Sequence, residues 1–169
     1  EGRMIYASVS RSFQGGGYNG GSFSLEEVGD GFDPEFLLAY EVGTKLSFAG
    51  GRLITNIAAF YYDYTDPQVF TLDGGQAGGV SAGFVSTIVN ADSATVKGLE
   101  LELVAHPTDS VAITAGIGLL DSAYGELVLA GPNGTIISGE GNQLISAPDV
   151  DLALGFSQVF AVGYGEYTL

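Results

Sequence analysis

The sequence predicts an all-β fold, an antiparallel up-and-down meander that forms part of a transmembrane β-barrel. Long segments alternate apolar and polar side chains with the period of two that β-strands have. Long glycine-rich connections alternate with short connections along the chain. Hydrophobic residues make up 46% of the chain, yet no apolar run reaches the roughly 18 residues that a membrane-spanning helix needs.

The first half of the chain predicts strands at residues 3–13, 37–48 and 52–64. In the second of these, Tyr40 belongs to an apolar face and Glu41 to the opposite, mixed face. The sequence Ala-Gly-Gly at 49–51 predicts a tight hairpin turn. The strand that follows is largely apolar on both sides, so its alternation assigns neither face to the core.

The second half predicts a strand at 84–106 with a bulge near 91–94, and further strands at 111–119, at 150–157 and from 164 onward. The clearest alternation in the chain lies between Gly98 and His106. Leu99, Leu101 and Leu103 share one face, whereas Glu100 and Glu102 share the other. We expect the leucines to face lipid.

The connections predict the topology. The long ones are 14–34, 65–83 and 123–148, and the short ones are 49–51, 107–109 and 160–163. A meander places all long loops on one side and all short turns on the other, as outer-membrane barrels do. The regular strands run for about 10 to 13 residues, enough to cross a bilayer at a tilt, which takes roughly 9–11.

Aromatic residues near the strand ends indicate interfacial girdles. They are Phe13, Tyr18, Tyr61, Tyr62, Tyr64 and Tyr164.

Several blocks, in this order along the chain, resemble the barrels of TonB-dependent outer-membrane receptors. Asn90-Ala91-Asp92 followed by Ala-Thr-Val-Lys-Gly-Leu-Glu-Leu-Glu at 94–102 is the longest of them. The others are Tyr-Ala-Ser-Val-Ser at 6–10, Gly-Gly-Tyr-Asn at 16–19, Phe-Asp-Pro-Glu at 32–35, Tyr-Glu-Val-Gly-Thr-Lys at 40–45 and Ala-Ala-Phe-Tyr-Tyr-Asp-Tyr at 58–64.

This resemblance implies that residues 1–169 are a partial barrel domain of about six to seven strands, lacking the plug and the C-terminal end. A chain that opens on a strand pattern and stops in mid-strand is expected to be a piece of a longer protein. The family resides in the bacterial outer membrane and imports scarce nutrients: siderophores or other iron complexes, cobalamin or glycans. It is not enzymatic and needs no cofactor.

The partners that the resemblance implies are outer-membrane lipid, the plug domain of the parent chain, the TonB complex acting through that plug, and a small-molecule ligand at the extracellular loops. The net charge of −15, from 5 Lys and Arg against 20 Asp and Glu, excludes nucleic acid as a partner. The resemblance fixes no ligand-binding residue on this chain.

An alternative is a soluble all-β carbohydrate- or calcium-binding module of the lectin or adhesin kind, with its acidic, glycine-rich loops as the binding end. A calcium site would draw oxygen ligands from loop carboxylates. The candidates are Asp30, Asp33, Asp63, Asp66 and Asp73. A third hypothesis is a hydrolase that uses Glu100 and Glu102, which lie about 7 Å apart along a strand.

Other motifs favour no chemistry. Residues 15–20 match G-x-G-x-x-G, but a dinucleotide site needs a helix directly afterwards, and no helical pattern follows. His106 is the only histidine, so it has no second histidine with which to form a metal site or triad. We therefore predict no catalytic, cofactor-binding or metal-ligating residue.

Overall fold

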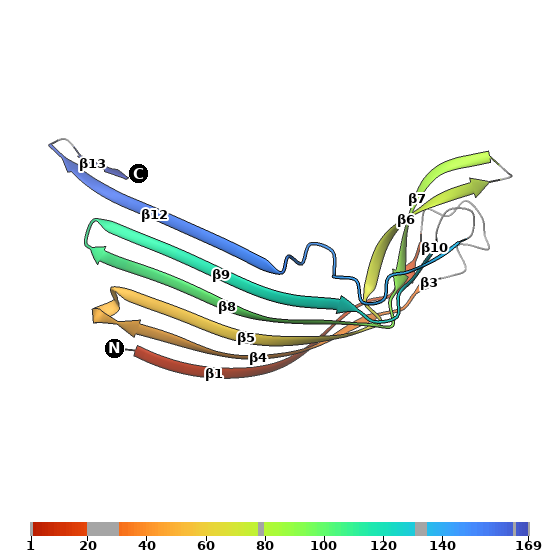
Figure 1. Ribbon diagram of the computed structural model, residues 1–169, viewed down its shortest axis with the longest axis horizontal. Helices are drawn as coiled ribbons and strands as arrows, with labels where there is room; N and C mark the ends of the chain where they lie inside the picture. Colours follow the sequence, from red (N-terminus) through yellow and green to blue (C-terminus); the bar gives the residue numbers. More distant parts are fainter. Residues whose placement is uncertain (1, 20–30, 78–79, 131–134, 164, 169) are drawn as a thin grey trace.

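The computed structural model describes residues 2–19, 31–77, 80–130, 135–163 and 165–168. Seven strands form one broad antiparallel sheet in the order β1-β4-β5-β8-β9-β12-β13 (Figure 1). Their bounds are β1 Gly2–Gln14, β4 Glu35–Phe48, β5 Leu53–Thr65, β8 Ser93–Thr108, β9 Val111–Tyr124, β12 Val150–Val162 and β13 Gly165–Thr168. The described residues contain no helix long and apolar enough to cross a membrane.

Each strand of the broad sheet pairs with the next one along the chain, which confirms the predicted meander. The three connections β4–β5, β8–β9 and β12–β13 are short and meet at one end, the turn end. The first contains the one-turn helix η1 (Ala49–Gly51), where Gly50 takes a φ of 67° that glycine adopts without strain. The three long connections meet at the opposite end, the loop end (Figure 1).

Each long connection contains a two-stranded hairpin of its own. The paired strands are β2 (Gly17–Tyr18) with β3 (Gly31–Phe32), β6 (Gln68–Ala77) with β7 (Val80–Asn90), and β10 (Val128–Ala130) with β11 (Ile136–Ser138). The prediction of a loop at 65–83 is therefore wrong. The predicted strand at 84–106 is also two strands, because β7 pairs with β6 and the chain leaves that hairpin at Ala91 before β8 begins.

The register of the sheet decides which side chains share a face, since residues directly opposite each other in an antiparallel pair project to the same side. Leu101 of β8 lies opposite Ile57 of β5 and Ile117 of β9. One face is therefore apolar across five neighbouring strands. We call it the apolar face; its hydrophobic members include Val42, Leu46, Phe48, Leu53, Ile57, Ala59, Leu99, Leu101, Leu103, Ala105, Ile113, Ala115, Ile117, Leu119, Val150, Leu152, Leu154 and Phe156.

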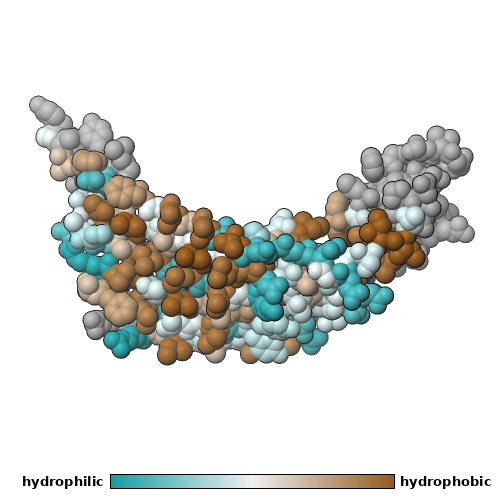
Figure 2. Space-filling view, viewed as in Figure 1, coloured by the Kyte–Doolittle hydropathy of each residue, from teal (hydrophilic) through white to brown (hydrophobic). Residues whose placement is uncertain are grey.

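The apolar face lies open along the described strands. Leu152 is 68% exposed and Leu154 is 87% exposed, and no second sheet packs on them among the described residues. Figure 2 shows hydrophobic side chains gathered over the turn side and the middle of the sheet, then a more hydrophilic stretch, and a further hydrophobic group at the loop end. A soluble sandwich would cover this face with a second sheet, whereas an open apolar face suits contact with lipid.

The apolar face ends towards the loops at an ion pair. Lys97 Nζ lies 3.0 Å from Asp121 Oδ2, directly across the β8–β9 pairing, and this is the next pair on the same face beyond Leu99 and Leu119. Along β5 the hydrophobic band runs from Leu53 to Tyr61, roughly 27 Å at about 3.4 Å per residue. At the tilt of roughly 35–45° found in outer-membrane barrels, that length spans about 20 Å of height, close to the apolar belt of about 25 Å.

The opposite face, the polar face, carries hydroxyl, amide, carboxylate and small side chains. In β5 it comprises Ile54, Asn56, Ala58, Phe60 and Tyr62, an assignment that the sequence pattern alone left open. Elsewhere it includes Tyr6, Ser8, Ser10, Glu41, Gly43, Lys45, Gly98, Glu100, Glu102, Thr114, Gly116, Gly118, Asp151 and Gly155. This mixture is typical of a barrel interior that holds water or another domain.

The two faces give a direct test in the complete membrane-embedded protein. Leu101→Arg places a charge in the middle of the apolar band, and we expect it to lower the free energy of unfolding by about 2–4 kcal/mol. Unfolding in phospholipid vesicles measures the difference.

Val104→Arg is the matched control, because Val104 lies opposite Ile54 and Thr114 on the polar face of the same strand. It should change the unfolding free energy far less. Equal losses for the two variants would contradict the assignment of the faces.

Candidate functional site: the polar face and the loop end

Carboxylates dominate the charge of the polar face. The Tyr6 hydroxyl donates a hydrogen bond of 2.6 Å to Glu41 Oε1, and Asn56 Nδ2 donates one of 3.1 Å to Glu102 Oε2. Lys45 is the one Lys or Arg on this face, since Arg3, Arg11 and Lys97 lie on the apolar face and Arg52 lies at the turn end. The polar face therefore carries a net negative charge.

Aromatic rings on the polar face lie across glycines of the neighbouring strand. Phe60 is paired with Gly98, where an added Cβ would come 2.5 Å from the ring atom Cζ. Tyr6 is paired with Gly43 in the same way, again with 2.5 Å to Cζ. Because the glycines have no side chain, each ring can lie over the adjacent backbone. Such cross-strand pairs of an aromatic residue and a glycine help to fix the register of a sheet.

Aromatic rings continue towards the loop end on the same face. Phe60 and Tyr62 stack with ring centroids 4.8 Å apart. Tyr64 and Tyr124 lie on either side of Ala94, which is only 2% exposed. The prediction that Tyr62 and Tyr64 belong to a lipid-facing girdle is therefore wrong, because the register places both on the polar face.

Tyr61 does lie on the apolar face, opposite Tyr40, with ring centroids 6.5 Å apart. Arg11, near the same end of β1, stands 5.3 Å from the centroid of the Phe36 ring. These residues suit an interface between hydrocarbon and head groups.

The loop end has a small apolar centre of its own. Val69 of β6, Ala91 and Leu127 are buried together, with Val89, Tyr124 and Leu129 packed around them. Main-chain bonds join the same segments: Asp92 N–H donates to the Glu126 carbonyl at 2.8 Å, and Ala91 N–H donates to the Pro67 carbonyl at 3.0 Å. The second and third long connections therefore share one base.

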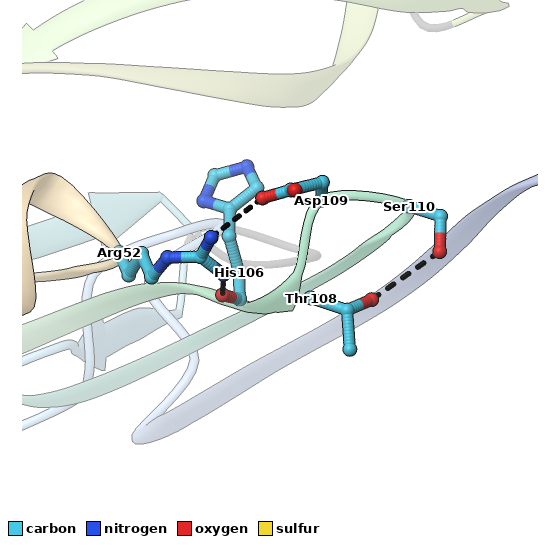
Figure 3. Close-up of polar contacts among 5 residues, drawn as sticks. All are labelled: Arg52, His106, Thr108, Asp109 and Ser110. Carbon is cyan, nitrogen blue, oxygen red and sulfur yellow. Dashed lines mark hydrogen bonds and ion pairs between the residues drawn. The ribbon is translucent and has the colours of Figure 1, made fainter.

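The turn end holds His106, which contacts Arg52 through its main chain (Figure 3). Its main-chain N–H donates to the Arg52 carbonyl at 2.7 Å, and its own carbonyl accepts from Arg52 Nη1 at 3.5 Å. Arg52 Nη2 also lies 2.6 Å from Asp109 Oδ1. Both side chains of this ion pair are at least half exposed, so its contribution is about 0–1 kcal/mol.

The remaining sequence candidates form no site among the residues that the structure describes. Glu100 and Glu102 lie on an open sheet surface, and Asp63 lies on the apolar side of β5, opposite Leu38. Asp30 lies outside the described residues. Across the described residues no three His, Asp or Glu side chains are placed to hold a metal ion.

The glycine motif at 15–20 has a structural explanation as far as it is described. A Cβ on Gly17 would come 2.9 Å from Cζ of Phe32, its partner in β3. Gly16 is similarly close to the main chain at Phe32 and Asp33. These glycines allow β2 and β3 to approach, and residues 20–30, where a nucleotide-binding helix would have to follow, lie outside the described residues.

An open sheet with one apolar and one polar face, long loops at one end and short turns at the other defines a segment of a membrane β-barrel wall. The family described as TonB dependent receptor-like, beta-barrel, matches residues 1–168. The chain belongs to this family, and the barrel lies in the bacterial outer membrane.

Solved structures share the fold. The ferric yersiniabactin uptake receptor FyuA from Yersinia pestis superposes with a TM-score of 0.71 at 20% identity, covering 98% of this chain and 22% of the receptor. The siderophore receptor PiuA from Acinetobacter baumannii gives 0.65 at 25% identity, covering 92% and 22%. The alcaligin receptor FauA from Bordetella pertussis gives 0.53 at 20% identity, covering 95% and 24%. The chain thus spans about a quarter or less of these receptors.

The pairing of Phe60 with Gly98 gives a second test. In Gly98→Ala the new Cβ would lie 2.5 Å from Phe60 Cζ and 2.6 Å from the main-chain oxygen of Leu119. Because a backbone oxygen in a sheet cannot move aside, we expect a loss of about 1–3 kcal/mol in unfolding free energy.

Gly116→Ala, in the next strand of the same face, is the control. Its Cβ would meet only the Ala153 Cβ at 3.6 Å, an ordinary contact. If both variants unfold at the same denaturant concentration, neither the Phe60 ring nor the Leu119 main-chain oxygen constrains position 98.

Proposed function

We propose that the complete receptor imports a ferric siderophore or another iron complex across the outer membrane. The observation that carries this proposal is the match of almost the whole chain to the fold of receptors for such complexes, among them the ferric yersiniabactin receptor. In this proposal the segment contributes part of the barrel wall and three of its outer connections. The function is binding and gated passage rather than covalent chemistry.

The polar face would line the barrel interior and contact the plug domain of the parent chain. The charge of this face supports the role, because its carboxylates Glu41, Glu100 and Glu102 outnumber the single cation Lys45. A plug surface rich in Lys or Arg would complement them. The apolar face would meet outer-membrane lipid, and energy would arrive from the TonB complex through the plug.

The charge of the loop end bears on which iron complex is taken. The segments 14–34, 66–92 and 125–149 contain no Lys, Arg or His, and each contains several carboxylates. Aromatic side chains are exposed there, with Tyr18 73% and Phe70 59% exposed. Such a surface favours a ligand that is neutral or cationic and repels a polyanion within the screening length of roughly 8 Å.

Uptake in a strain that carries the complete receptor as its only iron-complex receptor tests both the import of an iron complex and the preference for a neutral or cationic one. We expect uptake of an uncharged or cationic ferric trihydroxamate to exceed uptake of a trianionic ferric tris-catecholate. Radioactive iron accumulation measures the two rates, and a strain that lacks the receptor gives the background.

The outcomes separate the proposals. Uptake of neither complex above background would contradict iron import. Faster uptake of the trianionic complex would contradict only the charge preference.

A further inference from the structure

The side chain of Asn90, the last residue of β7, binds the main chain of the first long connection as a paired strand would. The Asp33 N–H donates to Asn90 Oδ1 at 2.8 Å, and Asn90 Nδ2 donates to the Asp33 carbonyl at 3.1 Å. The same Nδ2 donates to the Asp66 carbonyl at 2.7 Å. One side-chain amide therefore joins the end of the first connection to both ends of the β6–β7 hairpin.

The first connection has two described legs, residues 14–19 and residues 31–35. Asn90 contacts the second leg, and Asn19, in the first leg, makes the reciprocal contact with β7. The Ile88 N–H donates to Asn19 Oδ1 at 2.8 Å, and Asn19 Nδ2 donates to the Ile88 carbonyl at 3.0 Å. Ile88 lies two residues before Asn90 on the same strand. Each leg of the first connection is thus held on β7 by a two-bond contact between a side-chain amide and a peptide group.

Gln68, at the start of β6, adds a third set of bonds. Its Nε2 donates to the Gly15 carbonyl at 3.0 Å and to the Asp33 carbonyl at 3.1 Å, one on each leg. Its main-chain N–H donates to Glu35 Oε2 at 2.7 Å. Most of these bonds join uncharged groups, so they depend little on salt concentration.

We propose that these amides lock the legs of the first connection, 14–19 and 31–35, and the β6–β7 hairpin into one body, with Asn90 as the positioning residue. The inference rests on the proposed function, because the locked body would present the outer ligand-binding surface in one arrangement. A ligand that contacts either connection then acts on both. Through Ala91 and Leu127 the same base extends to the third connection.

The test uses the complete receptor, without ligand, spin-labelled at Tyr18→Cys and Phe70→Cys. These two exposed positions belong to β2 and β6, one on each side of the lock. We expect a single narrow distance distribution. Asn90→Asp should broaden it, because the carboxylate loses both N–H donors and places negative charge against the carbonyls of Asp33 and Asp66.

Asn142→Asp is the matched control, since Asn142 is an exposed residue of the third connection. It should leave the distribution narrow. A distribution in Asn90→Asp that is as narrow as in the parent receptor would overturn the proposal, whatever the receptor transports.

Asn19→Ala keeps the proposal testable if Asn90→Asp does not fold. Loss of the Asn19 side chain should raise the hydrogen-exchange rate of the Ile88 amide, and unchanged protection there would overturn the two-sided lock.

In transport assays with the ferric trihydroxamate, both variants should raise the half-saturating concentration and leave the maximal rate unchanged. A fall in the maximal rate alone would contradict a positioning role at the outer surface.

Discussion

The structure depends on one constraint: within lipid, every backbone N–H and C=O must find its partner in a neighbouring strand. The β4–β5 and β5–β8 ladders meet it with thirteen consecutive pairs each and no shift in register. The register shifts of the described strands lie elsewhere, one between Ala105 and Thr108 by the turn end and one between Gly74 and Gln76 in the outer hairpin. An unbroken ladder in turn fixes which side chains meet lipid and which meet the interior.

That ladder also separates the charges of the chain. The few cations lie mostly on the outer side or at the turns, whereas Glu41, Glu100 and Glu102 share the inner side with small residues and rings. Rings laid over Gly43 and Gly98 cover the backbone without thickening the wall. The inner surface is therefore acidic and carries small side chains and rings, unlike a packed apolar core.

The sequence predicts the meander and the face of Leu99, Leu101 and Leu103, because a period of two is a local property. The two faces of β5 could be assigned only from the register of β5 with Leu101 and Glu100 of β8, because both sides of β5 are apolar in sequence. The β6–β7 hairpin resembled a loop because its glycines obscure strand propensity, while its stability comes from cross-strand pairing. The contacts of Asn19 and Asn90 join residues 69 and 57 positions apart, beyond any local pattern.

The ion pair between Lys97 and Asp121 has a consequence for the height of the wall. It ends the hydrophobic band, yet β8 begins four residues farther out, at Ser93. The wall therefore continues about 13 Å along the strand past the pair, at roughly 3.3 Å per residue. The connections of the loop end are therefore separated from the hydrophobic band by this polar stretch of wall, so their surface lies beyond the depth at which the strands meet hydrocarbon.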